Sequence, residues 1–305
     1  MSNPNLKENK LLRFFGVSSR RIIKALSKRK YVELQYRYIT HHKLNLDSPI
    51  RYTEKLQYLR LYVYPKMDLA SRVAGRVGVR DYVEEKGYRE NLIPCLGVYD
   101  RFEDIDFSSL PNRFVMKCSH ASGWNIIVRD KASLNIAEAK SKFDRWLKKD
   151  YGKMTVEPHY SKIKPQIIIE EYIGGLDHLP TEYKIHVFNG VAKNLYVVTG
   201  RGEDIRYTQL YTDWTPFDGS QFNGWKKADE TPAKPKDFSE MLKMAENLAA
   251  PFPFVRVDLY EVNGKIYFSE MTLTPAKGTL ILDDDQVDFQ MGEWLDIGQY
   301  TNKGK

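Results

Sequence analysis

The alternation of apolar and polar positions predicts a hairpin near the C-terminal end of the chain. Residues 254–262 and 265–272 form two alternating runs on either side of Asn263-Gly264. A period of two is typical of half-buried strands, and Asn-Gly is the strongest short-range signal for a tight turn between them. We therefore predict an antiparallel hairpin over residues 254–272.

The length of its loop decides which side chains of this hairpin meet. Arg256 and Asp258 share one face of the first strand because strand side chains alternate. A two-residue turn would pair Asp258 with Ser269 and send Glu270 to the opposite face. A three-residue loop over 262–264, with its glycine left-handed in a bulge, would pair Arg256 with Glu270 and leave Asp258 diagonal to Glu270. Two hard oxygen ligands on one face can share a divalent ion, so we predict the three-residue loop. The alternative is an ordinary hairpin whose charges face water.

Similar patterns predict further strands upstream. The expected strands cover residues 113–118, 125–129, 166–172, 182–188 and 191–199, with a shorter one in 91–97. The small-residue loop 119–124 is either an ordinary hairpin connection or a loop whose backbone N–H groups lie over phosphates. The strand 166–172 is apolar on both faces and ends in two carboxylates, which suits a slot for adenine and ribose.

Apolar spacings of three and four predict four helices between these strands. They cover about 52–62, 72–87, 136–149 and 238–248. Asn135 followed by Glu138 is a capping-box pattern at the start of the third helix, and Asp237, with Glu240 three residues on, is predicted to cap the fourth.

Length and composition favour a globular protein. At 305 residues with 42% hydrophobic residues, the chain is long enough for two lobes, and it has no apolar run of about 18 residues that predicts a membrane span. Two cysteines, Cys95 and Cys118, form neither a disulfide framework nor a zinc spacing. We therefore expect a cytoplasmic protein.

The net charge of +7 is concentrated at the N-terminal end. Residues 1–60 hold 14 Lys and Arg against 4 Asp and Glu. Apolar residues recur there at helical spacing among basic ones: Leu11, Phe15, Ile22 and Leu26. A basic amphipathic helix of this kind can pack on the protein body, lie on an anionic membrane surface, or bind nucleic acid. We expect no nucleic-acid partner and consider peripheral contact with the inner membrane.

The order of these motifs resembles the ATP-grasp superfamily and, more narrowly, its TupA-like branch, which is named for teichuronopeptide biosynthesis. The resemblance covers residues 44–278. It is carried by four motifs: Phe114-Val-Met-Lys-Cys-Ser-His-Ala-Ser-Gly, Ile169-Glu-Glu-Tyr-Ile, Glu182-Tyr-Lys-Ile and Val255-Arg-Val-Asp-Leu-Tyr.

This resemblance implies an ATP-grasp fold, in which two α+β lobes grip ATP. The N-terminal helical extension would precede them. The domains expected are a basic amphipathic arm (1–43), a helical and α/β region (44–112), the small lobe (113–175) and the large lobe with the metal-binding hairpin (176–305).

The resemblance further implies that ATP is bound by residues from several motifs. Phosphate contacts would come from Arg76, Lys117 and Lys184. The loop closing over the phosphates would contribute Ser119, His120, Ser122 and Gly123. The hinge beside the adenine would be Glu170, Glu171 and Tyr172. Arg76 stands where the family usually has lysine, and arginine can hold a phosphate through two parallel hydrogen bonds.

Magnesium and the catalytic groups are implied in the same way. The Mg²⁺ ligands would be Asp258, Glu270 and Thr272, with threonine in a place where the superfamily often has asparagine. The implied catalytic residues are Lys117, Lys184 and Arg256. Arg256 lies on the Asp258 face and is the candidate for stabilising an oxyanion.

The implied reaction joins a carboxylate to an amine through an acyl phosphate, with ADP as a product, in the synthesis of a bacterial surface polysaccharide such as a capsule. The partner would be a small molecule or polysaccharide precursor. Arg201 and Arg206 either grip a uronic-acid-type carboxylate or are solvated surface residues. The alternatives are an ATP-dependent kinase, a glycosyltransferase-associated enzyme of the same pathway, or a non-catalytic basic binding protein.

Overall fold

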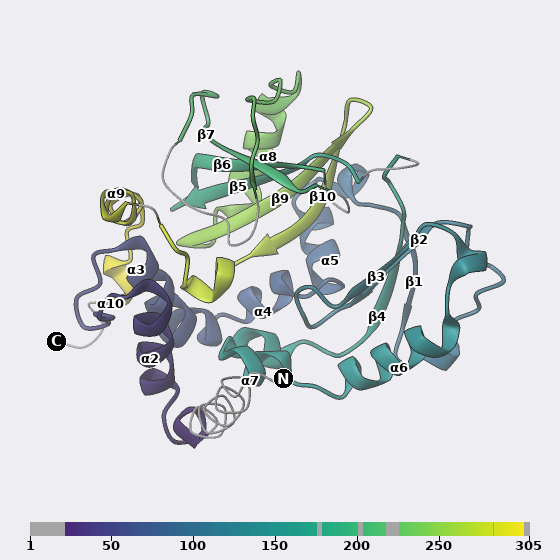
Figure 1. The fold of residues 1–305 in the computed structure, drawn as a ribbon, viewed down its shortest axis with the longest axis horizontal. Coiled ribbons are helices and arrows are strands. Elements are labelled where there is room, and N and C mark those ends of the chain that lie inside the picture. Colours follow the sequence, from purple (N-terminus) through teal and green to yellow (C-terminus); the bar gives the residue numbers. More distant parts are fainter. Residues whose placement is uncertain (1–21, 176–178, 201–203, 218–225, 283, 302–305) are drawn as a thin grey trace, which may run out of the picture.

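Two sheets joined by helices make up the part of the chain that the computed structural model describes, and all their strand pairs are antiparallel except the short parallel pair at the edge of the larger sheet (Figure 1). That part comprises residues 22–175, 179–200, 204–217, 226–282 and 284–301. In Figure 1 the larger sheet lies at the top and the smaller one at the right, and helices α4 (Asp68–Ala74) and α5 (Gly78–Glu85) lie between them. Among the described residues, no helix is both long and apolar enough to cross a membrane.

The smaller sheet has the strand order β1-β4-β2-β3. Its strands are β1 (Cys95–Tyr99), β2 (Phe114–Cys118), β3 (Asn125–Val128) and β4 (Ile167–Glu171). Alternate residues of β2 are buried, which explains why its sequence alternates. Helix α6 (Ile136–Leu147) packs against β2 and begins as predicted, because Asn135 Oδ1 accepts a hydrogen bond from the Glu138 N–H at 3.0 Å.

The larger sheet has the order β10-β9-β5-β6-β7-β8. Its strands are β5 (Glu182–Phe188), β6 (Val191–Thr199), β7 (Arg206–Tyr211), β8 (Lys226–Lys227), β9 (Phe254–Val262) and β10 (Lys265–Thr272). Helix α8 (Phe238–Ala249) packs on β9, β5 and β6, and it follows Asp237 as predicted, but the Asp237 side chain makes no capping hydrogen bond. All seven residues of β5 are buried because the strand lies inside the sheet. Polar side chains on β5 therefore need partners within the protein.

The turn between β9 and β10 has two residues, so the predicted three-residue loop is wrong. Lys265 pairs directly with Val262, and Asn263 and Gly264 both have positive φ, at 53° and 76°. Asn-Gly adopts this conformation readily, and its twist matches that of the strands. The extra residue lies further along, where a bulge between Phe268 and Glu270 leaves Ser269 out of the pairing. The bulge shifts the alternation by one residue and places Glu270 directly opposite Asp258.

The single helix predicted over 72–87 is also wrong, because it is divided into α4 and α5. Gly75 has an extended backbone with ψ of 134°. A Cβ there would lie 2.9 Å from Cγ2 of Ile163. The Arg76 N–H leaves the helical pattern and donates to the Ser119 carbonyl at 2.9 Å. Packing against a distant segment therefore ends the helix, and the break sets the position of Arg76.

The remaining helices cover the ends of the molecule. They are α2 (Lys28–Thr40), α3 (Tyr52–Tyr58), α7 (Tyr151–Thr155), α9 (Asp285–Trp294) and α10 (Gly298–Thr301), with a helical stretch at 22–26. Single turns of 3₁₀- or π-type occur at Leu59–Val63, Tyr64–Lys66, Arg89–Asn91, Phe102–Asp104, Lys131–Ser133, Pro158–Lys162 and Pro275–Gly278. Helix α3 packs on α9, which was not predicted from the sequence. The Thr53 side chain and N–H both donate to the Asp288 carboxylate there, at 2.6 and 2.9 Å.

Candidate active site

A polar cleft of about 240 Å³ lies between the two sheets. Its lining comes from the α4–α5 break, the β2–β3 hairpin and strands β5, β9 and β10. The residues are Arg76, Lys117, Ser122, Gly123, Asn125, Glu182, Lys184, Arg256, Tyr260, Ser269 and Glu270. Segments far apart in the sequence thus contribute charged side chains to one cavity.

The acidic pair at the cleft is Asp258 and Glu270, of which Glu270 lines the cavity and Asp258 is fully buried opposite it on the neighbouring strand. Arg256 grips Asp258 with two hydrogen bonds, from Nε to Oδ1 at 2.6 Å and from Nη2 to Oδ2 at 2.7 Å. The same Nη2 lies 3.3 Å from Glu270 Oε1 and 3.1 Å from Thr272 Oγ1. The three predicted metal ligands therefore meet around one guanidinium. They meet because β9 and β10 are paired and the Ser269 bulge turns Glu270 to the face of Asp258.

Strand β5 adds Lys184 to this centre. Lys184 pairs with Asp258 across the sheet, and its ammonium forms ion pairs with Asp258 and, at 2.9 Å, with Glu182 Oε1. Both Lys184 and Glu182 are 3% exposed. Sequence reasoning missed Glu182, although it stands two residues before Lys184 and therefore on the same strand face.

The two central carboxylates have opposite pKa shifts. Burial raises the pKa of Asp258, and the neighbouring Glu270 and Glu182 add to that effect against the attraction of Arg256 and Lys184. For Glu270, burial again favours the neutral form. It is outweighed by the charges of Arg76, Lys184 and Arg256, which hold the pKa of Glu270 well below its usual range. The site thus stabilises at least one firmly ionised carboxylate.

On the opposite side of the cleft, Glu170 of β4 holds two cations. The Lys117 ammonium lies 2.5 Å from Glu170 Oε2, and Arg80 Nη1 lies 3.0 Å from Glu170 Oε1. Burial would raise the pKa of Glu170, but the charge and hydrogen bond of Lys117 prevail and lower it. This carboxylate, predicted as part of an adenine hinge, is therefore engaged in orienting Lys117.

Arg76 links the two sides. Its guanidinium forms an ion pair with Glu270 of the larger sheet, while Arg80, on the same helix pair, binds Glu170 of the smaller sheet. The Arg80 Nη2 also donates to the Ile93 carbonyl at 2.8 Å. The α4–α5 segment thereby ties both carboxylate clusters together.

The predicted phosphate loop divides into two parts. Ser122 and Gly123 line the cleft, and Gly123 has a φ of 76°, which favours glycine. Ser119 and His120 are instead buried, with the Ser119 hydroxyl donating to the Lys164 carbonyl at 2.5 Å and His120 Nε2 lying 3.2 Å from the Lys149 carbonyl. Trp124 stacks on Trp146 at a centroid distance of 6.0 Å, which anchors the end of the loop.

The other predicted residues have separate positions. Glu171 is exposed at the end of β4. The Tyr172 hydroxyl is buried without a hydrogen-bond partner among the described residues. Arg206 forms ion pairs with Asp204 and Asp229 at 2.7 and 3.5 Å at the start of β7 and does not line the cleft. Arg201 lies outside the described residues.

A buried polar network below the cleft was not predicted. Thr274, two residues after Thr272, donates to Glu157, and both side chains are buried. Ala276 and Lys277 follow with positive φ of 48° and 60°, and the Lys277 carbonyl accepts hydrogen bonds from Gln57 and Arg60 at 2.8 Å. No sequence pattern marks these contacts, because the partners come from three distant segments.

Solved structures with a similar arrangement include D-alanine–D-alanine ligase from Helicobacter pylori, with 12% identity and a TM-score of 0.45 over 81% of this chain and 67% of that one. L-amino acid ligase from Bacillus licheniformis has 12% identity and a TM-score of 0.42, and the match covers 72% of this chain and 54% of that one. D-alanine–D-alanine ligase from Bacillus anthracis, in complex with ATP, has 14% identity and a TM-score of 0.37, and the match covers 68% of this chain and 55% of that one. The chain spans between about half and two thirds of the length of these structures.

A search of curated proteins finds no match. The family model described as TupA-like ATP-grasp matches residues 54–296, well over half of the chain. The match includes both sheets and every residue that lines the cleft. It confirms the resemblance inferred from the motifs and the ATP-grasp fold. This chain belongs to the TupA-like ATP-grasp family.

Proposed function

We propose that the protein is an ATP- and Mg²⁺-dependent ligase that joins a carboxylate to an amine through an acyl phosphate. The observation that carries this proposal is the meeting of cations and carboxylates from both sheets in one cleft. Lys117 comes from the smaller sheet, Lys184 and Arg256 come from the larger one, and Arg76 comes from between them. Phosphoryl transfer needs mainly positioning and charge neutralisation, which such a set provides.

ATP would lie with its phosphates among Lys117, Lys184 and Arg76. Its adenosine would face the end of β4, where Glu171 is exposed and the buried Tyr172 hydroxyl has no partner among the described residues. A buried hydroxyl without a partner costs free energy, so a ligand that accepts its hydrogen bond would be stabilised there. Glu170 would hold Lys117 in place from behind.

The residues present fit Mg²⁺. In proteins this ion is usually bound by one or two carboxylates together with phosphate oxygens and water. Asp258 and Glu270 supply the carboxylates, and the Thr272 hydroxyl lies 3.3 Å from Glu270 Oε1. Among the described residues no three His, Cys, Asp or Glu side chains are placed to hold a metal ion by themselves, so phosphate oxygens and water would supply the remaining ligands. Once bound, the ion would neutralise charge on the phosphates.

The proposed reaction has two steps. A carboxylate oxygen of the acceptor attacks the γ-phosphorus of ATP, the bond between that phosphorus and the bridging oxygen breaks, and ADP leaves. The amine nitrogen then attacks the acyl carbon, the bond from that carbon to the phosphate oxygen breaks, and the nitrogen releases a proton to solvent. The products are an amide, ADP and inorganic phosphate.

Arg256 would stabilise the oxyanion formed in the second step. Its Nε and Nη2 atoms are engaged by Asp258, Glu270 and Thr272, which fix the plane of the guanidinium. Its Nη1 makes no hydrogen bond with the described residues, and the side chain lines the cleft. A fixed donor directed at developing charge is the arrangement that lowers the barrier of acyl transfer.

The acceptor that suits this cationic cleft is a uronic-acid-type carboxylate of a bacterial surface polysaccharide precursor, joined to an amino acid or amine. Membership of a family named for teichuronopeptide biosynthesis supports this substrate class. The use of ATP would place the reaction in the cytoplasm.

An ADP-release assay tests the proposal. The protein is incubated with MgATP and mixtures of uronic acids and of amino acids and amines, added separately and together. Release that requires both mixtures, with an amide in the mass spectrum of the products, supports the ligase. Release with a single acceptor would show a kinase instead, and the absence of release with every mixture would indicate a binding protein.

A further inference from the structure

Helix α2 has one apolar face packed on the protein body. Val32 and Tyr36 are both 0% exposed, and they lie in a buried cluster with Leu44, Leu46 and Val156. The Tyr36 hydroxyl hydrogen-bonds with the Thr53 hydroxyl at 2.7 Å. The packing that fixes the helix to the body therefore uses one side of it.

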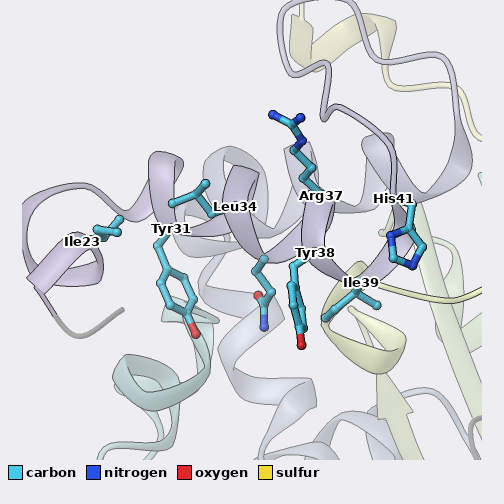
Figure 2. Close-up of a pocket in the computed structure, with 8 residues that line it drawn as sticks. Ile23, Tyr31, Leu34, Arg37, Tyr38, Ile39 and His41 are labelled. Atoms are coloured by element: carbon cyan, nitrogen blue, oxygen red, sulfur yellow. The ribbon is translucent and has the colours of Figure 1, made fainter. Parts of the chain in front are cut away.

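A second apolar face of the same region is exposed. Leu34 is 52% and Tyr38 72% exposed, and in the preceding stretch Ile22 is 60% and Leu26 82% exposed. These four are among eleven exposed large hydrophobic residues in the described part of the chain, yet they fall within 17 positions. Leu34 and Tyr38 line a concavity of about 960 Å³, where Leu34 and Arg37 project from one side of α2 and Tyr31 and Tyr38 from another (Figure 2). Clustered exposed apolar side chains mark interaction surfaces.

The same surface is strongly basic. Residues 22–43 contain six Lys and Arg against the single acid Glu33. Arg29 is held by Glu33 and Asp47, at 2.8 and 3.0 Å, whereas Lys28 and Lys30 are exposed. The surface therefore combines unburied apolar area with an excess of positive charge.

Charge selects the partner of this surface. A second copy would bring two surfaces of the same sign together, and residues 1–21 are themselves basic, with five Lys and Arg against one acid. An anionic partner is complementary to the charge, and the exposed leucines and isoleucines favour lipid over nucleic acid, which offers no apolar layer.

We propose that residues 22–43 form a docking surface for the anionic cytoplasmic face of a membrane. The apolar side chains would enter the boundary between headgroups and acyl chains, and Lys28 and Lys30 would contact the acidic headgroups. This inference goes beyond the ligase activity and does not depend on it.

Co-sedimentation of the full chain with vesicles tests the surface. Vesicles of phosphatidylcholine alone are compared with vesicles that contain about 30% phosphatidylglycerol, because such binding depends on the negative surface potential of acidic lipids. We expect binding to the anionic vesicles, weakened by raised salt. The variant Leu26→Ser/Leu34→Ser should lose it, and Lys28→Gln/Lys30→Gln should weaken it by at least about tenfold. The matched controls Ile136→Ser/Val191→Ser and Lys148→Gln/Lys149→Gln alter exposed residues elsewhere and should bind normally.

Equal binding to both kinds of vesicle, no binding, or equal losses in the controls would overturn the proposal. An environment-sensitive fluorophore on Leu34→Cys, in a Cys95→Ser background, separates the other occupants. A blue shift that appears with anionic vesicles supports lipid docking. A shift already present without vesicles and abolished by removing residues 1–21 would show that the chain covers its own surface. A shift that follows protein concentration would show a second copy, and one that requires RNA would show nucleic acid.

Discussion

Glu170 of the smaller sheet and Asp258 of the larger sheet are each held by two cationic side chains, yet their pKa values move in opposite directions. Burial favours the neutral form of both. For Glu170, which is 8% exposed, the charge of Lys117 outweighs burial and lowers the pKa. For Asp258, which is 0% exposed, burial and the neighbouring carboxylates outweigh Arg256 and Lys184 and raise it. Two cationic partners therefore do not decide the charge state of a buried acid.

The difference divides the cleft into two chemical sides. On the larger sheet three carboxylates, those of Glu182, Asp258 and Glu270, meet Lys184 and Arg256 of the same sheet, and Glu270 also pairs with Arg76. On the other side Lys117 and Arg80 meet the single carboxylate of Glu170. Neighbouring carboxylates can share a divalent cation, and two cations that share one carboxylate favour phosphate. On the proposed function, the metal would lie at the acids of the larger sheet, and the phosphates would extend from there towards Lys117.

Removing the acidic side should have the largest effect. The double substitution Asp258→Asn/Glu270→Gln should abolish the Mg²⁺-dependent part of ATP affinity, a loss of at least about a hundredfold, because the hard oxygen charges that hold the ion are gone. Isothermal titration calorimetry with and without Mg²⁺ measures it. The exposed acids of Asp229→Asn/Glu230→Gln provide the control. ATP affinity that still responds to Mg²⁺ as in the unaltered protein would contradict the metal role.

Arg256 should affect turnover more than binding. We expect Arg256→Ala to lower turnover by about 10²–10³, the effect of removing one oxyanion donor, while ATP affinity stays within about threefold. Steady-state kinetics and calorimetry separate the two. Exposed Arg145→Ala serves as the comparison. If turnover is unchanged, Arg256 is not the donor.

On the phosphate side, Lys117→Ala should weaken ATP binding by about ten- to a hundredfold, the range expected for one hydrogen bond to a charged group. The effect should persist without Mg²⁺, in contrast to the acidic pair. Glu170 retains Arg80 as a partner, so the protein should still fold. Lys149→Ala is the control, because Lys149 is exposed on another surface. A loss of ATP affinity that occurs only in the presence of Mg²⁺ would show that Lys117 acts through the metal, and would contradict a separate phosphate side.

The smallest effect is on stability. Because the pKa of Glu170 is lower in the folded protein than its ordinary value of 4.5, its ionisation stabilises the fold above about pH 4.5. That contribution is lost as the pH falls through the folded value. Glu170→Gln should therefore lower the free energy of unfolding by about 1–3 kcal/mol at pH 7 and progressively less below pH 4.5. Urea denaturation across pH 3.5–7 tests this, with exposed Glu171→Gln as control. If the difference in free energy of unfolding between the unaltered protein and Glu170→Gln grew as the pH fell, the prediction would be wrong.

Much of this architecture is readable from local patterns. Asn189-Gly190 and Asn263-Gly264 mark two hairpins because Asn-Gly adopts positive φ at little cost, and both hairpins form. Helix α6 begins where its capping residue indicates. These elements are set by interactions within a few residues.

The site depends on longer-range packing that the sequence does not reveal. Ser269 carries no local signal for a bulge, yet the bulge brings Glu270 to Asp258. The helix break that positions Arg76 falls at Gly75, where the chain packs so closely on the distant Ile163 that a Cβ would lie 2.9 Å from its Cγ2. Asp258 and Glu270 share one face as predicted, but the bulge in β10 brings them together and not a three-residue loop. Glu182 could have been predicted as a site residue, because strand alternation places it on the same face as Lys184.

A crystal structure with a non-hydrolysable ATP analogue and Mn²⁺ tests the central claim most directly, because Mn²⁺ gives an anomalous signal and accepts the same oxygen ligands as Mg²⁺. We predict a manganese peak bound by Asp258 and Glu270, with the analogue's phosphates reaching Lys117 across the cleft. A peak elsewhere, or phosphates bound away from Lys117, would contradict the account.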